Sequence, residues 1–183
     1  MTGKLTEGSF SIPKAARFAV VAARFNAFIV DDLLEGALTT LRKHGVAGAR
    51  VQVVRVPGAF ELPVVCKKLA ESGEYAAIIT LGCVIRGATA HFEYVAGGAA
   101  TGLMQVAVTS GVPVVFGVLT TETAAQAFER AGANADNKGS EAALCALEIA
   151  SLMAELAAPS KRGKRSKPAV TAAKRPGKKR KGR

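Results

Sequence analysis

The chain has 183 residues, of which 49% are hydrophobic, and this is enough for one compact domain with a buried core. Its formal net charge of +11 does not describe that domain, because residues 160–183 contain 12 of the 25 Lys and Arg residues and none of the 14 Asp and Glu residues. Residues 1–159 therefore carry 13 basic and 14 acidic side chains, which excludes a generally basic domain.

The predicted elements alternate between strands and helices. After an extended arm over residues 1–14, apolar runs typical of buried parallel strands occur at 17–23, 51–56, 76–81 and 112–119. This alternation predicts an α/β fold of three layers, with a four-stranded parallel sheet of flavodoxin-like order 2-1-3-4 flanked by helices. Ligands of such sheets collect at the carboxyl ends of the strands. The helices are expected at 29–44, 61–72, 91–109, 122–131 and 139–157.

The last part of the chain has a different composition. Among its many Lys, Arg, Pro and Gly residues only Val170 is bulky and apolar, so it cannot offset the entropy of ordering. We therefore expect a single domain over residues 1–158 and a disordered basic tail over 159–183. The tail is either solubilising or a nonspecific binder of nucleic acid phosphates, since it has no aromatic residue for base stacking.

The cysteines and histidines argue against a disulfide framework and a metal site. Cys66, Cys83 and Cys145 are an odd number and form no Cys-x-x-Cys pair, so we expect reduced, buried thiols. His44 and His91 are remote in sequence, and we expect no metal. Because no continuous hydrophobic segment opens the chain, we expect no signal peptide, no membrane span and a cytoplasmic location.

Residues 82–95, Gly-Cys-Val-Ile-Arg-Gly-Ala-Thr-Ala-His-Phe-Glu-Tyr-Val, form the most informative stretch. We expect a strand to end here in a small-residue turn that opens a helix, with backbone N–H groups free to hold a phosphate. Ala88 lets an anion approach closely, and Thr89 adds a hydroxyl as a helix N-cap or a ligand donor. His91 lies beside this possible phosphate site. The helix dipole there disfavours a protonated imidazole ring, whereas a bound phosphate favours it. These opposed effects could hold the ring near neutrality, which suits proton transfer.

This stretch resembles the lumazine synthase family, the riboflavin-pathway enzymes that make 6,7-dimethyl-8-ribityllumazine. Further matching strings occur in the family's order, and together they cover roughly residues 8–157. The further strings are Arg24-Phe25-Asn26, Pro57-Gly58-Ala59-Phe60-Glu61, Phe116-Gly117-Val118-Leu119-Thr120-Thr121, and Glu129-Arg130-Ala131-Gly132 with Asn137-Lys138-Gly139.

The resemblance implies a site for 5-amino-6-(D-ribitylamino)uracil. The family position of Phe25 stacks on the pyrimidine ring, and that of Phe116 contacts the same ring from the adjacent subunit. From the residues alone, Phe25 is a packing aromatic, Phe116 could equally belong to the core, and Glu61 is an ordinary first-turn acid. The thiol of Cys83 is not expected to be catalytic. The other implied contacts are Ala59, Phe60 and Glu61 to the ribityl chain and the backbone of Cys83, Val84 and Ile85 to the pyrimidine.

The resemblance also implies a site for 3,4-dihydroxy-2-butanone 4-phosphate. Ala88 and Thr89 would contact this substrate, Arg130 would bind its phosphate as a fork, and His91 would shuttle protons. Lys138 is either a polar contact near the site or a surface lysine at a helix start. The implied transferase reaction proceeds by imine formation, phosphate elimination and ring closure, without a cofactor.

Members of the family are pentamers, and many close into sixty-subunit shells. We therefore expect a homo-oligomer with active sites at subunit interfaces, in which the N-terminal arm adds as an edge strand to a neighbouring sheet. Residues 132–138 have no obvious insertion, which is compatible with a shell, although Asp136 stands where many relatives have glycine. The competing function is a flavodoxin-like module that only binds flavin or nucleotide, but such a module would not require Phe25, His91 and Arg130 together.

Overall fold

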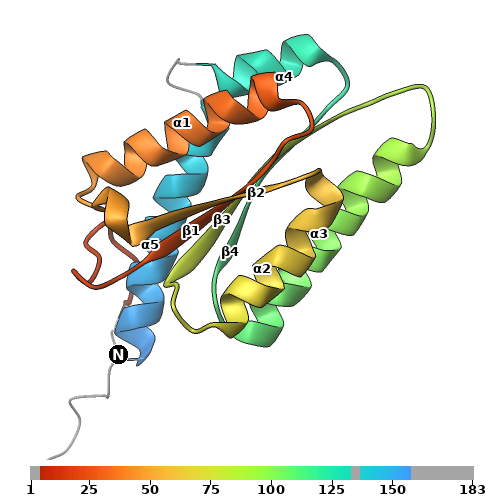
Figure 1. The fold of residues 1–183 in the computed structure, drawn as a ribbon. Helices are drawn as coiled ribbons and strands as arrows, with labels where there is room; N and C mark the ends of the chain where they lie inside the picture. Colours follow the sequence, from red (N-terminus) through yellow and green to blue (C-terminus); the bar gives the residue numbers. More distant parts are fainter. Residues whose placement is uncertain (1–4, 133–136, 158–183) are drawn as a thin grey trace, which may run out of the picture.

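Four parallel strands form the sheet at the centre of the fold, in the order β2-β1-β3-β4 (Figure 1). The computed structural model describes residues 5–132 and 137–157. The predicted fold class and strand order are confirmed. The strands are β1 (Phe18–Ala23), β2 (Val51–Val56), β3 (Ala77–Ile85) and β4 (Val114–Thr121).

Helices cover both faces of the sheet (Figure 1). Successive side chains of a strand point to opposite faces, and β1 is buried on both. Phe18, Val20 and Ala22 therefore pack into one core, while Ala19, Val21 and Ala23 pack into the other. The first core is covered by α1 (Ala27–Lys43), α4 (Ala124–Ala131) and α5 (Lys138–Ala157). The second core is covered by α2 (Leu62–Glu71) and α3 (His91–Ser110). Two short 3-10 helices occur at Gly48–Arg50 and Ala59–Glu61.

Two strands run further than predicted. β3 continues past Leu81 to Ile85, and β4 continues to Thr121. The reason is tertiary, because Cys83, Val84 and Ile85 pair with Leu119, Thr120 and Thr121. The small-residue turn therefore begins at Arg86, and the last three residues of β3 reach the edge where ligands collect.

The first helix begins earlier than predicted, at Ala27, so Asp31 and Asp32 do not lie in its first turn. Asp31 instead pairs with Arg55 of β2. Gly45 follows the end of the helix, with a positive φ of 80° and its N–H donating to the carbonyl of Arg42 at 3.0 Å.

Close packing between α1 and α5 depends on Asn137, directly before α5, and on two glycines. The side chain of Asn137 is 4% exposed; its Nδ2 donates to the carbonyls of Asp32, Ala131 and Gly132, and its Oδ1 accepts from the N–H of Ser140. A Cβ at Gly36 would overlap this amide, and a Cβ at Gly139 would overlap the carbonyl oxygen of Leu33. The Asn137-Lys138-Gly139 string thus has a structural role.

The described part of the N-terminal arm lies against its own domain. The N–H of Ser9 donates to Ser151 Oγ at 2.6 Å, and the Phe10 ring contacts His44 edge-on at 5.3 Å between centroids. Addition of the arm to a neighbouring sheet stays a prediction. The predictions for the basic tail and for Asp136 fall outside the described residues.

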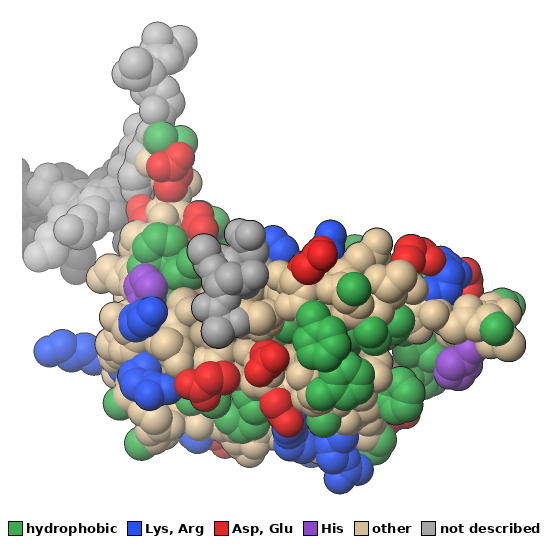
Figure 2. All heavy atoms as spheres, turned by 90° about the horizontal axis from the view of Figure 1, so that it is seen from above, with side chains coloured by type: hydrophobic (Ala, Val, Ile, Leu, Met, Phe, Trp, Pro, Cys, Tyr) green, Lys and Arg blue, Asp and Glu red, His purple; other side chains and the backbone are tan. Residues whose placement is uncertain are grey.

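Apolar side chains also remain on the surface. The rings of Phe28 from α1 and Phe128 from α4 pack together at 5.6 Å between centroids, and both are about half exposed. Figure 2 shows apolar side chains gathered on the face seen from above, with acidic and basic side chains around them. None of the helices in the described part of the chain has the length and apolar character needed to cross a membrane.

Candidate active site

A cavity of about 660 Å³ opens at the carboxyl ends of β1, β2 and β3, beside the start of α3. This is the edge of a parallel sheet where ligands bind. The cavity brings together residues from three separate stretches of the chain, at 25, 57–61 and 83–95. The predicted site residues that line it are Phe25, Ala59, Phe60, Glu61, Cys83, Val84, Ile85, Thr89 and His91, and Tyr94 lines it as well.

The turn after β1 is held by backbone and side-chain hydrogen bonds. The N–H groups of Arg24 and Phe25 donate to the carbonyls of Val56 and Pro57 at 2.8 and 2.9 Å. Asn26 has a left-handed backbone, with φ 57°, and its Nδ2 donates to the carbonyl of Cys83 at 2.9 Å. These bonds hold Phe25 at the cavity, where its ring is 69% exposed.

Sequence reasoning missed the role of Asn26. The available signal was its residue type, since Asn tolerates the left-handed region better than most residues. The contact itself joins positions 57 residues apart and depends on the neighbouring placement of β1 and β3.

Glu61 organises the next segment. Its Oε2 accepts a hydrogen bond from the N–H of Gly58 at 2.8 Å, which fixes the entry into the 3-10 turn before α2. The ring of Phe60 lies against Gly98 of α3, where a Cβ would approach the ring to 2.8 Å. Glu61 therefore has the structural role of a capping acid and also faces the cavity.

Cys83 lines the cavity from the end of β3, and its side chain is 2% exposed. Burial raises the pKa of its thiol to about 11, so the thiol is protonated near neutral pH. Because the thiolate is the nucleophilic form, this environment opposes a catalytic role, as expected from the sequence. Burial likewise raises the pKa of Cys66 to about 12.

The turn that follows β3 leads directly into α3, a helix of 20 residues that begins at His91. Ala90, not Thr89, occupies the N-cap position. Of the two roles considered for Thr89, the N-cap is therefore wrong, and the ligand donor stays a prediction. The side chain of Ala90 cannot accept a hydrogen bond, so it does not cap the first N–H groups of α3. Thr89 and His91 line the cavity, whereas Ala88 lies in the turn between Gly87 and Thr89 without being among its lining residues.

Arg86 connects this turn to its neighbours. Its guanidinium forms ion pairs with Glu93 of α3 and Glu122 after β4, and it stacks over the ring of Phe92 at 4.1 Å. The hydrogen bond from Arg86 lowers the pKa of Glu93. These contacts give Arg86 a structural role.

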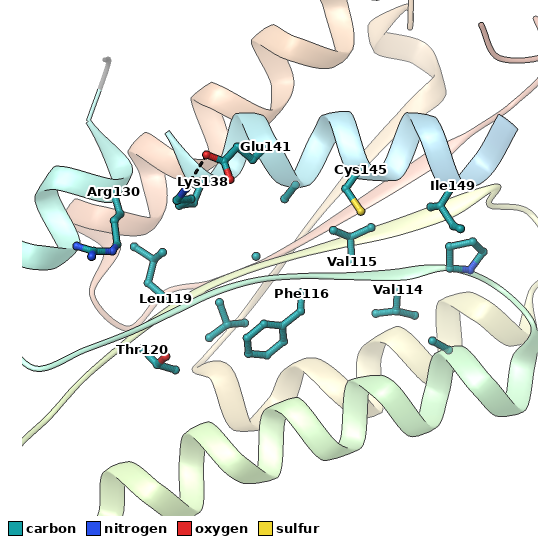
Figure 3. A pocket seen from close by; sticks show the side chains of 15 residues that line it. Val114, Val115, Phe116, Leu119, Thr120, Arg130, Lys138, Glu141, Cys145 and Ile149 are labelled. Carbon is teal, nitrogen blue, oxygen red and sulfur yellow. Dashed lines mark hydrogen bonds and ion pairs between the residues drawn. The ribbon is translucent and has the colours of Figure 1, made fainter. Parts of the chain in front are cut away.

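Phe116, Arg130 and Lys138 line a second cavity, of about 730 Å³, which runs along β4 and is also lined by residues of α3, α4 and α5 (Figure 3). Arg130 Nη1 donates to the carbonyl of Gln126 at 2.8 Å, and Lys138 Nζ pairs with Glu141 at 2.6 Å. Phe116 projects from β4 on the side away from α5. Within one chain, Phe116, Arg130 and Lys138 therefore belong to a different cavity from His91.

Cys145 also lines the second cavity and is exposed, so the prediction that all three thiols are buried is wrong for this residue. Cys145 lies on the face of α5 opposite to the residues that pack into the core. Among residues 5–132 and 137–157, no three His, Cys, Asp or Glu side chains gather in a way that would hold a metal ion.

Comparison with known families identifies the family of this chain. A sequence profile described as 6,7-dimethyl-8-ribityllumazine synthase matches residues 15–154, which include the whole sheet and every residue assigned above to either cavity. The basic tail lies beyond the match. Since the profile covers most of the chain, the protein belongs to the 6,7-dimethyl-8-ribityllumazine synthase family of riboflavin biosynthesis enzymes.

Proposed function

We propose that this chain condenses 5-amino-6-(D-ribitylamino)uracil with 3,4-dihydroxy-2-butanone 4-phosphate to form 6,7-dimethyl-8-ribityllumazine. The observation that carries the proposal is the first cavity, which combines an exposed aromatic ring, strand-end backbone and a helix N-terminus that begins with His91. These groups suit a planar heterocycle on one side and a phosphate on the other. Family membership supports the assignment to riboflavin biosynthesis.

The exposed ring of Phe25 supports binding of the pyrimidine substrate. Stacking of aromatic rings contributes about 0.5–1.5 kcal/mol beyond the burial of their area. While Oε2 of Glu61 holds Gly58, its other oxygen would accept hydrogen bonds from ribityl hydroxyls. The backbone of residues 83–85 would contact the polar edge of the pyrimidine.

The phosphate of the second substrate would lie at the N-terminus of α3, close to Ala88 and Thr89. A helix N-terminus carries the equivalent of about half a positive charge and favours anions. Arg130 would complete the phosphate site from an adjacent subunit, together with Lys138, and Phe116 of that subunit would cover the pyrimidine. The separation of these residues from His91 within one chain supports a site shared between subunits.

The chemistry requires positioning more than covalent help. The substrate amine attacks the ketone and water leaves to give an imine, a carbon-bound proton is removed, phosphate departs, and the ring closes with loss of a second water. His91 would transfer the proton, while Arg130 and the N–H groups of α3 hold the phosphate as it gains charge. Holding two substrates in contact contributes several kcal/mol to such a reaction.

A shared site requires an oligomer, and the surface of α3 supports one. Tyr94, Met104 and Val108 of this helix are exposed in the single chain, and Val108 is 78% exposed. A helix with large apolar residues around its circumference is usually buried. We therefore propose a homo-oligomer, and from the family resemblance we expect a pentamer, alone or within a sixty-subunit shell. Light scattering distinguishes these states, because they have about five or sixty times the 18.8 kDa mass of the chain.

The test is lumazine formation from the two substrates, followed by its absorbance. We expect His91→Ala to lower kcat with a modest change in KM, and Arg130→Ala chiefly to raise KM for the phosphate substrate. His44→Ala is a matched control, because His44 lies at the far end of α1, next to Phe10. Arg42→Ala, an exposed arginine of α1, is the control for Arg130.

Two results would overturn these assignments. A wild-type protein that binds flavin and forms no lumazine would be a binding module rather than a synthase. A His91→Ala variant that turns over as fast as the wild type would remove the proton-transfer role of His91, even if lumazine is formed.

A further inference from the structure

The turn that precedes α3 has few attachments of its own. Residues 87–90 are exposed, and they connect the end of β3 to the start of α3. Apart from the bonds of α3 itself, no hydrogen bond in the described part of the chain joins these four residues to another segment. The position of His91, which begins α3 and lines the first cavity, therefore depends on contacts made on either side of the turn.

The start of α3 also lies outside the core. The first fully buried residue of this helix is Ala99, eight residues after His91, which corresponds to about 12 Å along the helix axis. Before it, Val95 is partly buried against the second core, whereas His91, Glu93 and Tyr94 of the first turn are exposed. Core packing alone therefore leaves the first turn of α3 weakly held.

Arg86 supplies an anchor for this turn. Its N–H donates to the carbonyl of Thr121, the last residue of β4, at 2.9 Å, and its Nε pairs with Glu122 at 2.7 Å. From this position at the edge of the sheet the guanidinium reaches across residues 87–90. Its Nη1 pairs with Glu93, and its central carbon lies 4.1 Å from the centroid of the Phe92 ring. One side chain thus connects the end of β4 to the first turn of α3.

Phe92 and Glu93 are the two residues that directly follow His91, and Phe92 also lines the first cavity. Because neighbouring residues of a helix have fixed relative positions, an anchor on residues 92 and 93 also sets the position of His91. The same anchor sets the direction of the N–H groups at the start of the helix. Arg86 is not among the residues that line the cavity, so its effect on a bound substrate passes through this turn.

We propose that Arg86 is a positioning residue for the condensation reaction, which holds His91 and the first N–H groups of α3 in place by joining the end of β4 to residues 92 and 93. The inference rests on the proposed synthase function. A reacting group that is displaced by about 1 Å can cost a reaction about 100-fold in rate. A guanidinium suits this task better than an ammonium, because its planar fork contacts two carboxylates and a ring at once.

The experiment compares the kinetics of Arg86→Gln with those of a matched control, Arg17→Gln. Arg17 also pairs with a glutamate, Glu74, and also lies over a ring, that of Tyr75, but it precedes β1 at the opposite end of the sheet. We expect kcat of Arg86→Gln to fall by at least about 10-fold while both KM values change by less than about threefold. Arg17→Gln should keep wild-type kinetics. All assays are run well below the Tm of each variant, and light scattering checks that the assembly state is the same.

Two further variants test whether Arg86 acts through Glu93. Glu93→Gln removes the ion pair but leaves the contact with Phe92, so we expect a smaller fall in kcat than in Arg86→Gln. In the double variant the fall should be smaller than the product of the two single effects, because residues that act through one contact are not additive. Arg86→Lys keeps the charge without the fork, and we expect an intermediate kcat.

Hydrogen exchange gives a readout that needs no substrate. The peptide that covers residues 86–95 should exchange faster in Arg86→Gln than in the wild type, and at the wild-type rate in Arg17→Gln. Unchanged exchange in Arg86→Gln would overturn the inference, because the turn would then be held without this side chain.

The kinetic outcomes separate this inference from the proposed function. A wild type that forms no lumazine would overturn the proposed function and this inference with it. A wild type that forms lumazine, together with wild-type kcat in Arg86→Gln or in Arg86→Lys, or with independent effects of Arg86 and Glu93, would overturn this inference alone. A raised KM for the phosphate substrate at unchanged kcat in Arg86→Gln would also overturn it, because Arg86 would then be a direct ligand.

Discussion

Replacement of Asn137 by Ala tests the contact that joins α1, α4 and α5. The substitution removes an N-cap of α5, because Oδ1 of Asn137 accepts from the N–H of Ser140 at 3.0 Å. It also removes the amide that donates to the carbonyls of Asp32, Ala131 and Gly132. The side chain is 4% exposed, so water cannot readily replace these bonds.

The expected loss follows from these contacts. A lost N-cap costs about 1 kcal/mol. The amide has two hydrogens for its three acceptors, so the donor side contributes about two hydrogen bonds at about 1 kcal/mol each. The sum is about 3 kcal/mol, which corresponds to a decrease in Tm of about 6–12 °C for a domain of this length.

Urea unfolding followed by circular dichroism at 222 nm measures the loss, because the chain contains no Trp for fluorescence. Protein concentration is held constant, since assembly shifts apparent stability. The matched variant is Asn137→Asp, which keeps a capping oxygen but directs a carboxylate at the three carbonyls. We expect it to be destabilised at least as much as the Ala variant. A loss below about 1 kcal/mol in Asn137→Ala, or an Asp variant as stable as the wild type, would refute the assigned contacts.

Three further predictions follow from the candidate site. Asn26→Gly keeps the left-handed backbone but loses the hydrogen bond to the carbonyl of Cys83. We therefore expect a lower kcat/KM with little change in Tm. Wild-type kinetics in this variant would show that the hydrogen bond does not position the site. Cys145 is exposed and Cys83 is buried with a pKa of about 11, so a thiol reagent at pH 8 should modify Cys145 first, and faster reaction of Cys83 would contradict its burial. The lowered pKa of Glu93 stabilises the fold above the ordinary glutamate pKa, and this contribution is lost as the pH falls through the lowered value. In Arg86→Gln the stability should therefore fall less steeply in acid, as measured by urea unfolding from pH 7 to pH 3; an unchanged pH profile would mean that the pair contributes nothing.

The order of elements was predictable because local patterns determine it. Apolar runs and helical periodicity indicated the four strands and five α-helices of the described residues, and the right-handed crossover rule limited the sheet to few orders. The strand ends were less predictable. The apolar run was expected to end at Leu81, yet pairing with β4 extends β3 to Ile85. Strand length here is set by the partner strand rather than by the residues of β3 alone.

The residues of the candidate site were predicted largely from motifs that match the family. Their arrangement in space was not predicted. Phe25 and His91 were expected at strand ends and helix starts, and both line the first cavity. The sequence did not predict that Asn26 would hold the backbone of Cys83, or that Arg86 would join α3 to the turn after β4. These contacts connect residues far apart in the chain, so only the packed fold brings them together.

Neighbouring residues alone set the α/β alternation, the small-residue turn before α3 and the separation of charge between the domain and residues 160–183, because each of these is a local property of the chain. The packing of the elements selected which side chains share a cavity. It placed Arg130 and His91 in different cavities of one chain and left Cys145 exposed. The physical reason is that cavities form between elements, where strand register and helix packing set distances that no local pattern contains.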